Sequence, residues 1–314
     1  MSCEGRRHIL SLENISIGFD RYEQGLRKSM LTIIRDLQLY VHEGELVAVV
    51  GASGSGKSVL AHAILGILPP NAVCCGCMKF DEEELTPERL EQLRGREMVL
   101  IPQSVSYLDP LMKVGAQVSK GDRSSRRVRR QRELFERYGL QAETAALFPF
   151  ELSGGMARRV LISAATVEAP KLIIADEPTP GLHETVAAET IRHLRELADE
   201  GSGVLLITHD LELALQVADR VAVIYAGTVV EEALAEDFLY ETSLRHPYTK
   251  ALWRALPQNG FHPLPGSQPH PYEVTMGCPF RSRCESATPD CSAEIENRLI
   301  RCGTVRCIHA DEVE

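Results

Sequence analysis

The strongest constraint on the fold of this chain is a glycine-rich loop in its first quarter. Residues 51–58 read Gly-Ala-Ser-Gly-Ser-Gly-Lys-Ser, which fits the pattern G-x-x-x-x-G-K-[ST]. The apolar run Leu46–Val50 precedes this loop, and a helix is expected over Val59–Leu65. Glycines let backbone N–H groups approach phosphates closely, and a helix N-terminus favours the anion. The strand–loop–helix order therefore predicts a nucleoside triphosphate site within an α/β fold.

The same pattern assigns roles to individual side chains. Lys57 is expected to reach the β- and γ-phosphates, and the Ser58 hydroxyl is expected to ligate Mg²⁺. The residues of this segment expected to contact the nucleotide are Gly51, Ser53, Gly54, Ser55, Gly56, Lys57, Ser58 and Val59.

Three further apolar runs indicate buried strands. They are Leu172–Ala175, Val204–Ile207 and Val221–Ile224, and the apolar spacing within Glu184–Ala198 predicts a helix between them. Continuous apolar runs separated by helices are typical of a mainly parallel sheet. We therefore expect an α/β core over residues 9–257, interrupted by a mostly helical insert at residues 104–169. A proline-rich stretch follows the core and predicts a loop-rich extension over residues 258–314.

Charge and hydropathy exclude several classes of protein. The chain carries 34 Lys+Arg against 44 Asp+Glu, a net charge of −10, which argues against sequence-blind nucleic-acid binding. No apolar stretch is long enough to predict a membrane-spanning helix, and no signal peptide is expected at the N-terminus. Residues 120–137 hold eight basic side chains against three acidic ones. This basic stretch is interpreted as a solvated helix face or as a docking surface.

Four polar residues follow expected strands. Asp176 and Glu177 end the run at Leu172–Ala175, where one carboxylate can hold Mg²⁺ and the next can polarise the attacking water. His209 comes just after another strand and can stabilise charge on a γ-phosphate oxygen. Gln103 follows Val99–Pro102 and can reach both the metal ion and the water.

The segment Leu152-Ser-Gly-Gly-Met156 lies between the phosphate loop and the acid pair. This order resembles the ATP-binding-cassette ATPases over residues 9–257. The resemblance implies a RecA-like core, an antiparallel β subdomain and a helical subdomain. It also implies a head-to-tail dimer, in which Ser153, Gly154 and Gly155 cap ATP bound at the other subunit's phosphate loop.

The resemblance also supplies roles for single residues. It implies that Gln103 is the Q-loop residue, Asp176 the Mg²⁺ carboxylate, Glu177 the catalytic base and His209 the switch histidine. Ser58 and Gln103 would complete the Mg²⁺ ligands from this chain. Phe19 falls where the family stacks an aromatic ring on adenine, with Tyr22 as the alternative.

Two motifs, one near the end of the core and one in the extension, indicate the subfamily. His246-Pro-Tyr-Thr249 and Gly277-Cys-Pro-Phe-Arg-Ser-Arg-Cys284 resemble the dipeptide, oligopeptide and nickel importer ATPases. Such a subunit is expected on the cytoplasmic face of the plasma membrane, as a peripheral protein. Its expected partners are a second, non-identical ATPase, two permeases and an extracytoplasmic binding protein, with no nucleic acid. Peptides, nickel and metal chelates all stay open as the transported substrate.

Two departures from the family pattern qualify these expectations. His183 stands where the family normally has Asp after the acid pair, which puts equal activity of the two ATP sites in doubt. The stretch from Val118 to Leu152 is also short for the usual helical arm.

The nine cysteines are unevenly distributed, with five of them between residues 278 and 307. An odd number in a chain without a visible leader favours reduced thiols or a metal site over disulfides. The resemblance favours a 4Fe–4S cluster, with zinc and free thiols as alternatives; the expected ligands are Cys278, Cys284, Cys291 and Cys307. Cys302 competes with Cys307, the group Cys74, Cys75 and Cys77 is interpreted as structural, and Cys3 is unexplained.

Two other functional classes are weighed against the importer ATPase. A soluble cassette ATPase acting on nucleic acid or ribosomes would have paired cassettes, a coiled coil or a basic surface. A P-loop kinase would lack the Leu-Ser-Gly-Gly segment and His246-Pro-Tyr-Thr249. Neither class fits this chain as well.

Overall fold

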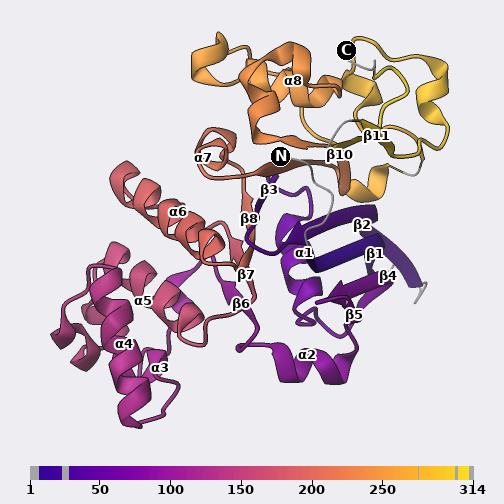
Figure 1. Ribbon diagram of the computed structural model, residues 1–314. Helices are drawn as coiled ribbons and strands as arrows, with labels where there is room; N and C mark the ends of the chain where they lie inside the picture. The colour runs from indigo at the N-terminus through magenta and orange to yellow at the C-terminus, as the bar shows by residue number, and fades with distance from the viewer. Residues whose placement is uncertain (1–6, 23–27, 275, 301–302, 311–314) are drawn as a thin grey trace.

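The computed structural model describes residues 7–22, 28–274, 276–300 and 303–310. Its larger sheet has eight strands in the order β11-β12-β10-β9-β3-β8-β7-β6 (Figure 1). Five neighbouring strands are parallel: β9 (Arg220–Tyr225), β3 (Leu46–Val50), β8 (Gly203–Thr208), β7 (Leu172–Asp176) and β6 (Met98–Ile101). Every apolar run singled out in the sequence lies in one of these strands, which confirms the parallel α/β core.

The other edge of this sheet is antiparallel and includes the extension. Strand β10 (Thr228–Leu234) pairs with β9 on one side and with β12 (Gly303–Val305) on the other. Strand β11 (Arg298–Ile300) then pairs with β12. The extension therefore continues the sheet of the core, a pairing that the short strands of this region did not predict.

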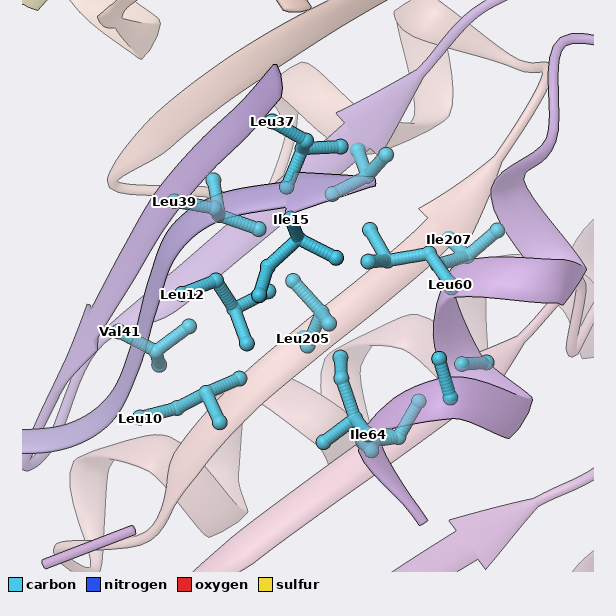
Figure 2. Close-up of a cluster of buried hydrophobic side chains, with 14 of the residues drawn as sticks. Leu10, Leu12, Ile15, Leu37, Leu39, Val41, Leu60, Ile64, Leu205 and Ile207 are labelled. Carbon is cyan, nitrogen blue, oxygen red and sulfur yellow. The ribbon is translucent and has the colours of Figure 1, made fainter. Parts of the chain in front are cut away.

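A second, four-stranded sheet has the order β2-β1-β4-β5. It consists of β1 (His8–Tyr22), β2 (Lys28–His42), β4 (Ala72–Phe80) and β5 (Glu83–Glu84), all paired antiparallel. Figure 2 shows the apolar side chains of β1 and β2 facing those of the first helix and of β8. The main contributors to this fully buried layer are Leu10, Leu12, Ile15, Leu37, Leu39, Leu60, Ile64, Leu205 and Ile207.

The insert at residues 104–169 is helical, as predicted. It contains α3 (Val114–Val118), α4 (Ser125–Arg137), α5 (Gly154–Thr166) and the 3-10 turns η1 (Val105–Tyr107), η2 (Ala142–Ala146) and η3 (Pro149–Glu151). These helices lie together on one side of the molecule, away from the antiparallel sheet (Figure 1). They have an apolar core of their own that includes Val114, Phe135 and Val160.

The remaining α-helices all connect strands. They are α1 (Lys57–Ile64), α2 (Pro87–Leu93), α6 (Glu184–Asp199), α7 (Leu211–Leu215) and α8 (Pro247–Arg254). The 3-10 turns η4 (Ala235–Leu239), η5 (Glu241–Ser243), η6 (Pro257–Asn259), η7 (Pro271–Glu273), η8 (Arg281–Arg283) and η9 (Pro289–Ser292) follow β10. Within the described ranges, no helix has the length and apolar character needed to span a bilayer.

A buried ionic network joins the two sheets. Glu45 accepts hydrogen bonds from the His42 backbone N–H at 2.8 Å and from Arg220 Nη1 at 2.9 Å. Arg220 also pairs with Glu232 on β10. Burial alone would raise the pKa of Glu45, but the hydrogen bond from His42 and the charge of Arg220 hold it at about 2. The carboxylate therefore stays ionised between strands from both sheets.

Candidate functional site

The phosphate loop connects β3 to α1, as the sequence predicts. Gly54 and Gly56 have φ values of +80° and +99°, which other residues rarely adopt. A Cβ at Gly51 would lie 2.3 Å from the Ile224 carbonyl oxygen of β9, so the loop is also pressed against the sheet. The glycines are therefore required by the backbone path as well as by the ligand.

Two polar side chains of the loop are arranged for an anion. Lys57 Nζ donates to the carbonyls of Gly51 at 2.8 Å and Ala52 at 3.0 Å, so the ammonium group lies inside the curve of the loop. The Ser55 hydroxyl is buried, and no residue within the described ranges forms a hydrogen bond with it. Burial lowers the pKa of Lys57, and the charges of Glu177 and Asp176 oppose this effect. An incoming phosphate would supply the missing acceptor and a counter-charge.

The predicted Mg²⁺ residues contact each other directly. Ser58 Oγ donates to Asp176 Oδ1 at 3.1 Å, across a sequence separation of 118 residues. Burial raises the pKa of Asp176, while the Ser58 hydrogen bond opposes that shift. The described residues include no group of three or more His, Cys, Asp or Glu side chains placed to hold a metal ion. That is compatible with Mg²⁺, because this ion is usually bound by few protein oxygens together with substrate phosphates and waters.

Glu177 and His209 form a second pair. His209 Nδ1 lies 2.9 Å from Glu177 Oε2, and the Glu177 N–H donates to the Ile207 carbonyl at 2.8 Å. Glu177 has a φ of +43°, an unfavourable backbone conformation that is often found at functional sites. The imidazole, expected to face a γ-phosphate, thus contacts the expected general base in this structure. Such a contact can orient the carboxylate.

Gln103 lies just after β6, and its side chain is exposed. Its carbonyl accepts a hydrogen bond from Arg158 Nη2 at 2.6 Å, and the Pro102 carbonyl accepts one from Nη1 at 2.5 Å. Arg158 is buried in α5, and burial lowers its pKa. It therefore ties the segment of Gln103 to the helix that begins at the Leu-Ser-Gly-Gly segment. The sequence analysis did not identify Arg158. Its position on the apolar face of α5, three residues before Leu161, could have indicated a buried arginine.

The Leu-Ser-Gly-Gly segment begins α5. Ser153 caps this helix, because its Oγ accepts a hydrogen bond from the Met156 N–H at 3.3 Å, as expected. Ser153 and Gly154 are exposed, and a Cβ at Gly154 would meet no atom within 4 Å. Among the hydrogen bonds of the described residues, none joins this segment to the chain's own phosphate loop. Nothing in the single chain therefore requires a glycine at position 154.

The two adenine-stacking candidates both lie in β1. Phe19 is half-buried and pairs with Leu31 and Ala72 in the antiparallel sheet. Tyr22 is 66% exposed, and the Lys28 ammonium lies 5.7 Å from its ring centroid.

The four extension cysteines expected to bind a cluster are neighbours. Burial, together with the charges of Cys307, Cys284 and Cys291, raises the pKa of Cys278 to about 11. All four are free thiols. Their arrangement in this structure does not make a metal site, since no three ligand side chains of the described residues converge on one point. Cys302 and Cys3 lie outside the described residues.

Two of these thiols instead contact histidines. Cys278 Sγ lies 3.8 Å from His246 Nε2, and Cys291 Sγ lies 3.5 Å from His309 Nε2. Burial lowers the pKa of His246 to about 3, so this imidazole is neutral. Cys74 and Cys75 are exposed on β4, and Cys77 is half-buried, so the first two thiols fill no core space.

Comparison with known proteins adds family relationships to this geometry. A family model described as ABC transporter matches residues 34–180, and one described as oligopeptide/dipeptide transporter, C-terminal region, matches residues 230–291. The chain is 36% identical over 306 residues to the dipeptide transport ATP-binding protein DppD of Escherichia coli K12, covering 91% of each chain. It is 37% identical over 289 residues to the oligopeptide transport ATP-binding protein OppD of Lactococcus lactis subsp. cremoris SK11, covering 85% of this chain and 82% of that one.

A solved structure shares the fold. The dimeric structure of MJ0796, described as a bacterial ABC transporter cassette, superimposes with a TM-score of 0.62 at 26% identity. The match covers 72% of this chain and 98% of that one, so part of this chain has no counterpart in the solved cassette.

Proposed function

The chain belongs to the ATP-binding-cassette ATPases of the oligopeptide and dipeptide transporter family, and we propose that it hydrolyses ATP to drive uptake of short peptides through two permease subunits. The observation that carries this proposal is the placement of two contacting pairs, Ser58 with Asp176 and Glu177 with His209, after three parallel strands. Relatives named for dipeptide and oligopeptide transport favour peptides. Uptake of nickel or a metal chelate has no comparable support.

The chemistry follows from the chain's own side chains. Bound Mg²⁺–ATP supplies the γ-phosphate and neutralises charge on the leaving oxygens. The loop N–H groups and Lys57 would hold the phosphates, and the oxygens of Ser58 and Asp176, with Gln103, would hold the metal ion. Glu177 accepts a proton from the attacking water, and His209 orients that carboxylate. Phe19 contributes an apolar face to the adenine.

The exposed Leu-Ser-Gly-Gly segment supports a dimer. Ser153, Gly154 and Gly155 would contact the ATP of a second ATPase subunit, and the open space at Gly154 leaves room for that approach. His183 occupies the N-cap position of α6 where the family has Asp, but its side chain makes no capping hydrogen bond, and its Nδ1 lies 3.1 Å from Thr185 Oγ1. We propose that the second subunit is a non-identical homologue and that the two ATP sites are unequal.

The helical insert carries the surface proposed for the permeases. Large apolar side chains are exposed around η1 and η3, with Leu111 88% and Phe150 74% exposed. Tyr107 and Met112 continue the same stretch. Contiguous exposed apolar side chains favour a protein contact. Docking here would hold the subunit at the cytoplasmic face of the plasma membrane, where an extracytoplasmic binding protein delivers the peptide.

The boundaries 9–257 for the core and 258–314 for the extension form part of the proposal, as does a 4Fe–4S cluster at Cys278, Cys284, Cys291 and Cys307. The cluster is supported by the mutual proximity of the thiols, but it requires them to rearrange. Anaerobically purified protein with a broad absorbance near 400 nm would support it, as expected for thiolate-ligated iron. Colourless protein with stoichiometric zinc would contradict it.

The Glu177→Gln variant tests the function. We expect the ATP turnover of the assembled transporter to fall by roughly 100-fold or more, because a general base is lost while binding is retained. ATP affinity should stay close to wild type, and ATP should hold the ATPase dimer closed in gel filtration. Glu212→Gln, which removes an exposed acid three residues after His209, is the matched control. Normal turnover by Glu177→Gln would contradict the assignment of the base.

A further inference from the structure

A basic cavity lies between α8 and the extension. Its volume is about 430 Å³, and Figure 1 shows α8 beside the extension at the far end of the molecule from α4. The lining includes Arg245, Lys250, Arg254 and Arg283, with Glu285 as the acidic side chain among the lining residues. Pro247, Leu264 and Phe280 give the same cavity apolar walls. A cavity of this size, lined by both basic and apolar side chains, suits an organic anion better than an inorganic anion.

Arg245 is the buried charge of this cavity. Its side chain is only 1% exposed, and its Nε and Nη1 have no hydrogen-bond partner among the described residues. The Nη1 atom lies 3.6 Å from Glu231 Oε1 and 4.0 Å from Asp237 Oδ2, distances that are too long for hydrogen bonds. Leaving buried guanidinium donors unpaired is costly. Arg245 is among the residues that line the cavity, so a shift of its side chain toward the cavity would let an entering acceptor satisfy them.

Unlike Arg245, two other cationic side chains in the lining form no ion pair with a carboxylate of the described residues. Arg283 donates to the Pro265 carbonyl at 2.8 Å and to Tyr225 Oη at 3.1 Å, so its donors are used while its charge is not neutralised. The Lys250 ammonium makes no hydrogen bond or ion pair with the described residues. Arg254, by contrast, pairs with Glu241 at 2.5 Å. The cavity therefore retains a positive charge that is available to a ligand.

The wall of this cavity is connected to the phosphate loop. The ring of Phe280 lies 5.3 Å from that of Tyr248, which is in the first turn of α8. Burial raises the pKa of the Tyr248 hydroxyl to about 12, and the neighbouring backbone of Ala52 in the phosphate loop opposes that rise. A ligand that draws Arg245 and Lys250 toward itself acts on both ends of the turn that carries Tyr248.

We propose that this cavity binds a small organic acid, whose carboxylate contacts Arg245 and Lys250 and whose apolar part packs on Phe280. Binding is coupled to ATP binding through Tyr248. By thermodynamic linkage, the acid changes ATP affinity by the same factor as ATP changes affinity for the acid. The cavity would thereby give the extension a regulatory role.

Binding is tested by calorimetry on the full chain with three probes. N-acetyl-phenylalanine carries both features, its amide lacks the charge, and inorganic phosphate lacks the apolar part. We expect the acid to bind at least tenfold more tightly than the amide or phosphate. Lys250→Gln should weaken binding of the acid about tenfold, whereas Arg192→Gln, which removes an exposed charge on α6, should not.

Absence of binding, equal binding of the amide, or wild-type binding by Lys250→Gln would overturn the site. Equal binding of phosphate would overturn the organic part of the proposal. Coupling is measured as the ratio of ATP Kd values with and without saturating acid. We expect a ratio of at least threefold in the wild type, in either direction, and a ratio near one in Tyr248→Phe. A ratio near one in the wild type would overturn the coupling.

Discussion

The phosphate loop and the cysteine-bearing extension are built in opposite ways. In the loop, Lys57 reaches carbonyls only five and six residues away, and the required backbone angles belong to two nearby glycines. In the extension, Cys278 contacts a histidine 32 residues earlier in the chain. A site made by one short segment is defined by the spacing of residues within that segment. A site assembled from distant segments depends on how those segments pack.

The two regions also differ in how arginines stabilise them. In the core, Arg220 is buried against the carboxylates of Glu45 and Glu232, a network that depends on ionised groups. In the extension, Arg283 donates to backbone carbonyls of Leu264, Pro265 and Gly266, which do not titrate. The core is therefore expected to be sensitive to acid at this network, while these contacts of Arg283 are not.

The largest expected effect comes from two glycine substitutions, one in the phosphate loop and one in the extension, which should distinguish the two regions. Gly51→Ala places a Cβ 2.3 Å from the Ile224 carbonyl oxygen, and Gly277→Ala places one 2.4 Å from that of Cys291. Each should cost about 1–3 kcal/mol of unfolding free energy through overpacking. Only Gly51→Ala should weaken ATP binding, by roughly tenfold or more, because only it displaces the phosphate loop.

Equilibrium unfolding and ATP titration of both variants check this contrast. Gly201→Ala is a control, since Gly201 has a φ of +107° but open space around its Cβ position. The Gly201→Ala variant therefore measures the cost in unfolding free energy of backbone strain without steric contact. Loss of ATP binding in Gly277→Ala as severe as in Gly51→Ala would show that the two regions are not independent.

Glu45→Gln should remove the acid sensitivity of the core network. The pKa of Glu45 is about 2 in the folded chain, below its ordinary value of 4.5. Its stabilising effect is therefore complete above pH 4.5 and is lost as the pH falls toward 2. At pH 7 the variant should lose roughly 3 kcal/mol, since Arg220 keeps Glu232 as a partner. The difference from wild type should shrink between pH 4.5 and 2.

Urea unfolding at several pH values measures this difference. Glu43→Gln is the matched control, because Glu43 is exposed two residues earlier. A difference between Glu45→Gln and wild type that stays constant down to pH 2 would contradict the ionic role of Glu45.

The smallest effect is expected for the cysteines of β4. Cys74→Ser should change the unfolding free energy by less than about 0.5 kcal/mol, because the thiol is exposed. Cys278→Ser replaces a buried thiol and should cost about 1–2 kcal/mol, because a hydroxyl is harder to desolvate. Both are measured on reduced protein. Equal costs would mean that burial does not distinguish the two cysteine groups.

Local patterns predicted the strands and helices of the core closely. The run Leu172–Ala175 lies in β7, and the helix expected over Glu184–Ala198 is α6, one residue longer. Apolar periodicity reports which face of an element is buried, so these elements were predictable. The contact of Arg158 with the carbonyls of Pro102 and Gln103 was not, because it joins residues 55 and 56 positions apart.

The order of motifs along the chain was enough to identify the nucleotide loop, the acid pair and the family, because each motif is a short run whose chemistry depends on adjacent residues. Tertiary structure decided the rest: that β12 joins β10, that His209 contacts Glu177, and that the thiols of Cys278 and Cys291 contact histidines. It also brought basic side chains of α8 and the extension around one cavity. Those contacts depend on which distant segments pack together, and neither residue spacing nor propensity carries that information.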